Sequence, residues 1–530
     1  MKSALAIFGC AFGLTFAPHL AGATPPVASV LRAGDFEHYV GSFNADDEEV
    51  YGGTIRNTNA WAFLSDNIPL FECPDKTLEE IYYFRWWTYR KHLRQTPDGF
   101  VVTEFLPDVP WAGKYNTINC AAGHHFYEGR WLRDPRYLDE YATFWLRKGG
   151  GVRVYSFWIA DSLWNRYLVT GLAGEIKELF PDLVANYRGW EKDNLGPDGL
   201  FWQIDGRDGM EMPIGDNNDK PGYRPTINTY MFADARAIAK IAELVGNEGV
   251  AEEFRGKAAR LKQLVQEGLW DKSAGFFKFL PVRPDAKLSA GRELFGYTPW
   301  YANLPDPGYE VAWKQIMDTN GFYAPYGLTT AERRCSDFRL SYQGHECQWN
   351  GPSWPYSTAV TLTSMANLLN NYQQSVIGKQ DYFEVLSAYA KSQHLKRESG
   401  VVVPWIDEDL NPLTGDWIAR TIMRGKGKEI YERGKDYNHS TFCDLIVNGL
   451  VGLRPRADDT IEVNPLVPEG RWNYFCLDAV LYHGHILTIF YDKTGTRYNR
   501  GAGLRVLADG VGVAVAPGLS RMTGALPKRP

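Results

Sequence analysis

Hydrophobic side chains recur at three- and four-residue spacing through most of the chain, the pattern of helices that bury one face. Several of these stretches are apolar on all sides, as expected for helices enclosed by other helices. The pattern predicts a mainly α-helical protein. The predicted helices cover residues 78–94, 136–147, 155–170, 173–190, 226–244, 250–269, 309–317, 353–372, 382–394 and 440–451.

The segments between these helices are long and rich in Gly, Pro, Asn, Asp and aromatic residues. They cover residues 99–125, 191–225, 271–307, 321–352 and 395–438. Long loops of this kind inside a compact domain are usually functional. Because they fall between successive helix pairs, they predict a helical toroid whose hairpins present loops at one end.

The pattern changes near residue 456. Clusters of β-branched and aromatic residues at 479–482 and 486–491 are separated by turn-forming residues, which predicts a small antiparallel β unit over residues 456–515. Residues 516–530 contain Pro, Gly and basic residues without periodicity, and we expect them to form a frayed tail.

Residues 1–23 have the pattern of a secretory signal peptide. Lys2 precedes an apolar run over residues 5–16, and residues 21–23 (AGA) form a small-residue cleavage site. A membrane anchor is the weaker alternative, since the run is short and interrupted by Gly. We expect a secreted or periplasmic bacterial protein without a membrane span. Its domains would be an extended N-terminal segment over residues 24–70 and the helical domain over residues 71–455.

Six cysteines follow the predicted signal peptide, and none forms a CxxC pair, so a zinc or redox site is not expected. An oxidising compartment permits disulfides, and Cys335 and Cys347 are the nearest pair in sequence. Buried free thiols are an equally good expectation for the remaining cysteines.

Aromatic content narrows the class of partner. Aromatic residues make up 14% of the chain, with 18 Trp and 30 Tyr, and their apolar faces and polar edges suit carbohydrate. Most of them are expected to fill a large core. A formal charge of −6 argues against a nucleic-acid partner, which would need a concentrated basic face. We therefore expect a carbohydrate substrate.

Two carboxylate-rich segments lie about two hundred residues apart, at 205–211 (DGRDGME) and 407–415 (DEDLNPLTG). A glycosidase needs one acid to protonate the departing sugar oxygen and a second carboxylate on the other side of the ring. Between them lies the segment 348–355 (QWNGPSWP), whose Trp and amide side chains suit sugar faces and hydroxyl groups.

These segments resemble motifs of bacterial glycoside hydrolase family 63, which includes mannosylglycerate hydrolase and processing glucosidases. The family pattern Trp-Arg-Gly-Pro-x-Trp-Pro is similar to residues 349–355, with Asn350 replacing Arg, and residues 230–234 (YMFAD) match a further motif. The resemblance spans about residues 70–455 and implies an (α/α)6 barrel, a six-hairpin toroid. Other segments resemble family 142 β-L-arabinofuranosidase domains: residues 83–90, 124–131 and 437–442.

The family 63 resemblance implies that Asp208 is the catalytic acid and Glu408 the base of an inverting hydrolysis. Alternatively, Asp208 is a turn or cap residue, and Glu211 is then the next candidate acid. Asp407 and Asp409 are competing candidates for the base. Three adjacent acids in a loop are also often a solvated run or a cation site. No metal or cofactor is expected, since the segment 193–199 lacks the alternating oxygen ligands of a calcium loop.

The predicted substrate contacts come from the same segments. They are Arg207, Glu211, Gln348, Trp349, Asn350, Trp354 and His439. Core packing of the two Trp side chains is an equal alternative, and helix capping explains Ser440 better than a site role does. The early loops also carry polar and aromatic residues, some of which should line the pocket: Glu104, Asp108, Trp111, His124, His125, Glu128 and Arg130.

Three functions remain open from the sequence. The first is an exo-acting inverting glycoside hydrolase, because bulky loop aromatics favour a blind pocket that admits one terminal sugar. An arabinofuranoside, glucoside or mannoside would be the substrate. The second is a polysaccharide lyase, since lyases also use helical toroids and Tyr, His and Asn chemistry. The third is a glycan-binding protein without catalysis.

Overall fold

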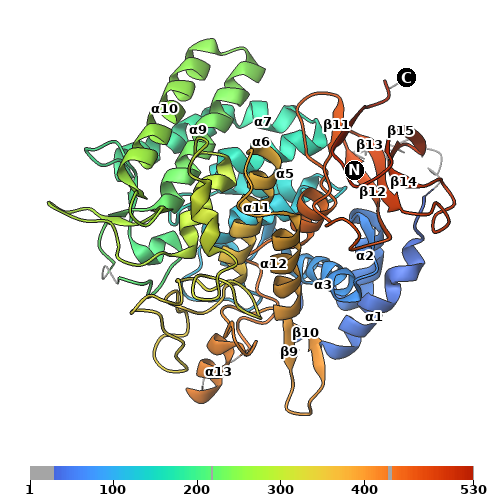
Figure 1. The fold of residues 1–530 in the computed structure, drawn as a ribbon, viewed down its shortest axis with the longest axis horizontal. Helices are drawn as coiled ribbons and strands as arrows, with labels where there is room; N and C mark the ends of the chain where they lie inside the picture. The colour runs from blue at the N-terminus through green and yellow to red at the C-terminus, as the bar shows by residue number, and fades with distance from the viewer. Residues whose placement is uncertain (1–28, 216–218, 428–431, 529–530) are drawn as a thin grey trace, which may run out of the picture.

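The computed structural model describes residues 29–215, 219–427 and 432–528, and it shows the expected (α/α)6 toroid with a C-terminal β unit (Figure 1). The predicted signal peptide lies outside the described residues. None of the helices within those ranges is long and apolar enough to cross a membrane. All six cysteines in the described ranges are free, including Cys335 and Cys347.

An inner ring of six helical segments forms the centre of the toroid, and each packs against the next along the ring. Most of these segments are buried on all sides, as their apolar sequences require. They are α4 (Ala122–Gly129), α6 (Ile159–Thr170), α9 (Pro225–Val245), η6 (Leu294–Ala302), α11 (Pro355–Asn371) and η8 (Leu445–Leu450).

An outer layer of helical segments covers the inner ring. In the outer helix α10, the buried residues Ala251, Phe254, Ala258, Leu261 and Val265 recur every three or four positions, so one face meets the ring. The outer segments are α3 (Lys76–His92), α5 (Arg136–Arg147), α7 (Gly174–Glu178), α8 (Phe180–Asn194), α10 (Glu248–Gly268), η7 (Glu310–Gln315) and α12 (Lys379–Ser392).

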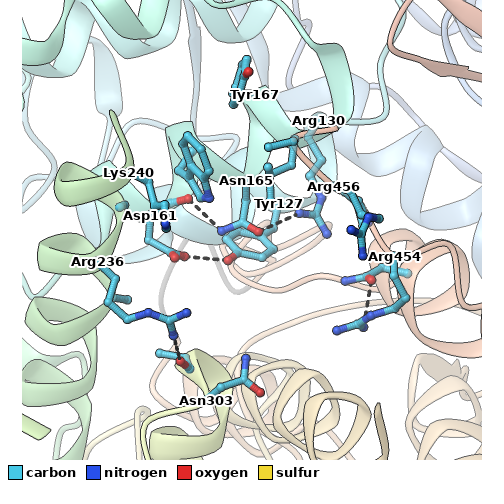
Figure 2. Close-up of a pocket in the computed structure, with 18 of the residues that line it drawn as sticks. Tyr127, Arg130, Asp161, Asn165, Tyr167, Arg236, Lys240, Asn303, Arg454 and Arg456 are labelled. Atoms are coloured by element: carbon cyan, nitrogen blue, oxygen red, sulfur yellow. Dashed lines mark hydrogen bonds between the residues drawn. The ribbon is translucent and has the colours of Figure 1, made fainter. Parts of the chain in front are cut away.

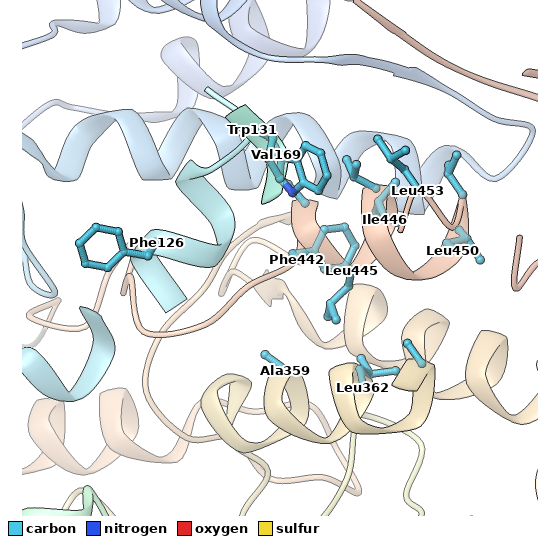
Figure 3. Packing of buried hydrophobic residues seen from close by; sticks show 14 of the residues in the cluster. Phe126, Trp131, Val169, Ala359, Leu362, Phe442, Leu445, Ile446, Leu450 and Leu453 are labelled. Atoms are coloured by element: carbon cyan, nitrogen blue, oxygen red, sulfur yellow. The ribbon is translucent and has the colours of Figure 1, made fainter. Parts of the chain in front are cut away.

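The ring closes where the last inner segment meets the first. The Glu128 carboxylate at the end of α4 accepts hydrogen bonds from the backbone N–H groups of Phe442 (3.0 Å), Cys443 (2.8 Å) and Asp444 (2.8 Å). Arg130 pairs with the Asp444 carboxylate at 2.7 Å. The first N–H groups of a helix lack partners within it, so a buried carboxylate is a strong acceptor there. Apolar side chains of α4, α11 and η8 pack around this junction (Figure 3).

The N-terminal segment is not extended as predicted. Residues 29–70 contain α1 (Glu37–Asp46) and α2 (Ala60–Asn67), because Phe36, Val40 and Phe43 form one buried face. Other helical segments of the toroid were also not predicted. In α4 and η6, internal Gly or Pro obscures the helical period, and α13 (Ile418–Gly425) lies inside a predicted loop.

The C-terminal unit is an antiparallel sheet with strand order β1-β12-β13-β14-β15, beside α1 and α2 (Figure 1). The tail prediction is wrong, because β16 pairs with β11 and Leu519 and Leu526 are buried. The strands of this unit are β1 (Leu70–Glu72), β11 (Thr460–Val463), β12 (Tyr474–Tyr482), β13 (His485–Asp492), β14 (Gly503–Ala508), β15 (Val511–Ala516) and β16 (Met522–Ala525).

Short antiparallel strands stiffen the loops of the toroid. They pair as β2 (Leu93–Thr96) with β3 (Gly99–Val102), β6 (Trp270–Asp271) with β7 (Phe276–Phe277) and β9 (His394–Lys396) with β10 (Val402–Pro404). A three-stranded sheet joins β4 (Trp202–Gln203), β5 (Gly222–Tyr223) and β8 (Leu280–Pro281).

Candidate active site

A cavity of about 290 Å³ lies at the end of the toroid where the loops enter the inner segments. Its walls come from residues just before α4, α6, α9, α11 and η8, so a rigid ring positions loop side chains around one space. The lining residues are Glu104, Phe105, Trp111, Ile118, Cys120, Tyr155, Gly209, Glu211, His345, Glu346, Cys347, Trp349, Trp354, Tyr356, Glu408, Arg433, Tyr437 and His439.

Glu408 lies in the cavity wall and is held from two sides. Arg433 Nη2 donates to its Oε1 at 2.6 Å, and the thiol of Cys347 donates to its Oε2 at 3.3 Å. The side chain is almost fully buried. The charge-assisted bond to Arg433 fixes the orientation of the carboxylate. This arrangement suits a base that activates a positioned water.

The neighbours of Glu408 are turned into the protein rather than into the cavity. Asp407 Oδ1 accepts from the Glu408 backbone N–H at 2.8 Å, and burial together with the Glu408 charge raises the pKa of Asp407 to about 7. Asp409 accepts from the backbone N–H of Ala419 at the start of α13. Neither residue lines the cavity. Of the three adjacent acids, only Glu408 is placed to meet a ligand there.

Glu211 lines the same cavity on a loop that is tied to the aromatic segment. Its backbone carbonyl accepts from Trp349 N–H at 3.1 Å, which joins the loop before α9 to the loop before α11. Burial raises the pKa of Glu211, and the charge of Glu408 raises it further. The cavity thus contains a carboxyl group with a raised pKa and a second carboxyl group that is paired with arginine.

Asp208 is buried behind the cavity and does not line it. Its Oδ2 accepts from the Thr226 hydroxyl at the start of α9, and its Oδ1 has no hydrogen-bond partner among the described residues. Burial raises the pKa of Asp208 to about 6, against the opposing charge of Arg224. Arg224 itself pairs with Asp205. The loop therefore places Asp208 in an inner charged cluster and Glu211 at the ligand space.

Glu104 is a third carboxyl group in the cavity. The Tyr437 hydroxyl donates to its Oε1, whereas its buried Oε2 has no hydrogen-bond partner among the described residues. Burial raises the pKa of Glu104 to about 8, and the charges of Glu408 and Glu211 add to this effect. At neutral pH the group is protonated, so it can donate a hydrogen bond to a sugar oxygen.

We expect the free energy of unfolding to fall as pH rises from about 4.5 to 8, and Glu104→Gln to make this fall shallower. Folded Glu104 keeps its proton up to about pH 8, whereas the unfolded group releases it near 4.5. One such proton contributes a slope of at most about 1.4 kcal/mol per pH unit. Denaturant unfolding at several pH values measures the slope. The exposed control Glu398→Gln should keep the wild-type slope; equal slopes in all three proteins would contradict the assignment.

The two Trp side chains of the aromatic segment have different surroundings. Trp349 is covered on both faces, by Trp354 at a centroid distance of 4.4 Å and by Phe295 at 5.4 Å. Trp354 meets His439 edge-on at 5.8 Å, and its indole N–H donates to the Gln348 carbonyl. Trp349 consequently packs the wall, and a sugar face can stack on neither of its sides. Trp354 keeps the better position for a ligand contact.

The other predicted contacts divide between the cavity and the protein interior. His439 lines the cavity, and its ring lies tilted against that of Tyr437 with centroids 3.7 Å apart; neither ring nitrogen has a hydrogen-bond partner among the described residues. Burial lowers its pKa, so it is a neutral imidazole. Arg207 is exposed and lies over the ring of the lining residue Tyr155 at 5.0 Å. Gln348 and Asn350 do not line the cavity, and Gln348 binds loop carbonyls instead.

Among the early-loop candidates, Glu104 and Trp111 line the cavity, whereas Asp108 pairs with Arg94 at the surface. His124, His125 and Glu128 lie within the protein, and Arg130 lines a different cavity.

The sequence analysis missed the partners that hold the carboxyl groups. Arg433, Cys347 and Tyr437 lie 25, 61 and 333 positions from the groups they bond, so no local motif connects them. Arg433 and Tyr437 do lie in the same predicted loop as Glu408, residues 395–438, but nothing in the sequence distinguishes Arg433 from the other basic residues of that loop. In the described part of the chain, no group of three or more His, Cys, Asp or Glu side chains is placed to hold a metal ion.

Comparisons with known proteins agree with this architecture. Residues 114–440 match the family model of the mannosylglycerate hydrolase MGH1-like glycoside hydrolase domain, and residues 453–515 match the C-terminal domain of glycosyl hydrolase family 65. A solved structure titled "Sialidase" is 46% identical over 93% of this chain, with a TM-score of 0.87. This chain spans only 45% of that protein's length.

Two rhamnosidases share the fold at low identity. The GH78 family rhamnosidase of Bacillus sp. GL1 is 11% identical over 83% of this chain and 41% of its own, with a TM-score of 0.56. The alpha-L-rhamnosidase from Dictyoglumus thermophilum is 14% identical over 81% of this chain and 43% of its own, with a TM-score of 0.51.

Proposed function

Because the chain belongs to the MGH1-like glycoside hydrolase family, we propose that it is an exo-acting, inverting enzyme that releases one terminal monosaccharide from an oligo- or polysaccharide. The observation that carries this proposal is the pairing of Glu211 and Glu408 in one small cavity. Inverting hydrolysis needs a protonated acid and an ionised base on opposite sides of the scissile bond.

In this proposal Glu408 is the base and the segment 205–211 supplies the acid. We assign the acid to Glu211, since it lines the cavity and its pKa is raised. Asp208, the acid implied by the family 63 motif, remains the competing assignment because its pKa is also raised. As Glu408 removes a proton from water, the acid delivers its own proton to the departing sugar oxygen, and Glu408 ends the step protonated.

The size of the cavity supports exo action. At about 290 Å³ it lies at the lower end of the range for ligand pockets, and one sugar ring fills much of it. Protonated Glu104, neutral His439 and the Trp354 ring are placed to contact hydroxyl groups and a sugar face. An arabinofuranoside, glucoside or mannoside is the proposed substrate, and the signal-like residues 1–23 support action outside the cytoplasm.

A panel of oligosaccharides and aryl glycosides of arabinofuranose, glucose, mannose and rhamnose tests this proposal. We expect a single monosaccharide to be released, and proton NMR during the first turnovers should show the anomer opposite to that of the substrate. Early mixed oligosaccharides would contradict exo action, and a retained anomer would contradict inversion. New absorbance from an unsaturated uronate would instead identify a lyase, and binding without any turnover would identify a glycan-binding protein.

A further inference from the structure

A second and larger cavity, of about 840 Å³, lies at the opposite end of the inner ring. In α9 its lining begins at Ala233 and reaches Leu244, whereas the α9 start at Pro225 adjoins the Asp208 loop. In α11 it is lined by Thr363 and Asn367, whereas Tyr356 faces the catalytic cavity. We call this space the basal cavity. Figure 2 shows side chains from α4, α6, α9 and the segment after η8 around it.

Two arginines in the basal cavity have no carboxylate within ion-pair distance among the described residues. Arg454 is held by the amide oxygens of Asn448 (3.0 Å) and Asn367 (2.9 Å), and Arg236 donates to the Ala302 carbonyl at 2.7 Å. They lie on opposite walls of the cavity (Figure 2). A guanidinium group that lines a cavity and is bonded only to neutral oxygens retains the capacity to bind an anion.

The remaining charges do not neutralise these two groups. Arg130 is committed to Asp444, and Arg456 is committed to Asp458 and Glu462. Asp161, which lines the same cavity, accepts from the Tyr127 hydroxyl; burial raises its pKa, against the opposing charges of Arg236 and Arg130. Arg454 also lies close to another cation. Burial lowers the pKa of Arg454 to about 10, and the charge of Arg130 adds to this effect.

The neutral part of the lining is suited to a sugar. Trp164 and Tyr167 of α6 are only partly buried and lie next to each other, with ring centroids 5.2 Å apart. Asn165 and Asn303 add amide groups that can bond hydroxyls. Partly exposed aromatic rings beside amides are typical of surfaces that hold saccharides, whereas a site for a small inorganic anion needs neither.

We propose that the basal cavity binds a carboxylated saccharide, whose carboxylate groups pair with Arg236 and Arg454 while its sugar rings contact Trp164 and Tyr167. The site is separate from the catalytic cavity, so it would hold an acidic part of a glycan independently of hydrolysis. This inference does not depend on which sugar is cleaved or on the stereochemistry of cleavage.

Calorimetric titration with trigalacturonate, and with cellotriose as the neutral counterpart, tests the proposal. We expect trigalacturonate to bind more tightly than cellotriose, and Arg236→Gln to weaken trigalacturonate binding about tenfold, as for the loss of one charge-assisted contact. Arg454→Gln should weaken it at least as much. Arg188→Gln removes an exposed arginine that pairs with Glu253 outside the cavity, and it should leave the affinity unchanged.

Two further measurements keep the result specific to the basal cavity. Arg236 is exposed, so its variant is expected to fold even if the more enclosed Arg454→Gln does not. Glu408→Gln should bind trigalacturonate like the wild type; a loss there would place the ligand in the catalytic cavity and overturn the proposal. The proposal would also be overturned if trigalacturonate did not bind, or if cellotriose bound equally well. An unchanged affinity in Arg236→Gln, or equally effective competition from inorganic phosphate, would overturn it too.

Discussion

Glu408→Gln is expected to lower the rate of hydrolysis by about 10²–10⁴-fold, the usual contribution of one positioned base. The amide has the shape of the carboxylate but cannot take a proton from water. Because Glu408 bonds Arg433 through Oε1 and Cys347 through Oε2, the substitution also weakens the ion pair that orients the side chain. The initial rate of monosaccharide release on the best natural glycan measures the effect.

The substitution Glu408→Ala distinguishes the loss of the base from the loss of the ion pair that orients it. Glu408→Ala opens space for azide, and azide should restore turnover of an aryl glycoside by replacing the activated water. The exposed control Glu398→Gln, whose carboxylate pairs with Arg424, should retain full activity. Near wild-type turnover of Glu408→Gln would transfer the base to Asp407 or Asp409, the other acids of that loop.

Glu211→Gln is expected to cause a similar loss on substrates with a poor leaving group, and a much smaller loss on dinitrophenyl glycosides. A leaving group that departs as a stable anion needs no proton, so removal of the acid costs little there. The same comparison for Asp208→Asn distinguishes the two acids. We expect Asp208→Asn to lower both rates by about the same factor, because Asp208 lies behind the cavity and bonds Thr226.

The pH profile gives a second test of the acid. The alkaline limb of kcat/KM reports the acid of the free enzyme, so it should be lost in Glu211→Gln and retained in Asp208→Asn. If the loss of rate depended on the leaving group in Asp208→Asn but not in Glu211→Gln, Asp208 would be the acid, as the family 63 motif implies.

Helices with a long polar face were the easiest part of the fold to predict. The α10 period is visible because polar residues alternate with its buried face. The inner segments α4 and η6 were missed because both are short and contain Gly, and η6 also contains Pro, whereas the longer buried helices α9 and α11 were predicted. β16 was missed because its pairing with β11 is a backbone interaction that side chains hardly record.

The motifs of the site could be predicted from the sequence, but the directions in which their side chains point could not. Glu211, Trp354, Glu408 and His439 were each identified and do meet in one cavity. The sequence could not show which acid of the 205–211 loop faces inward, because a one-residue change in a Gly-rich turn reverses the direction of the side chains. The bond between Glu104 and Tyr437 joins residues 333 positions apart and leaves no local pattern.

The junction at Glu128 has a consequence for how the protein is made. Its three backbone partners lie 314 to 316 positions further along the chain, so a nascent chain exposes this carboxylate long before residue 444 leaves the ribosome. Contacts of such long range are slow to form, and unfinished barrels expose apolar surface in the meantime. The toroid is therefore completed only after the earlier hairpins have been synthesised, and folding of the inner ring cannot finish during synthesis of its first segments.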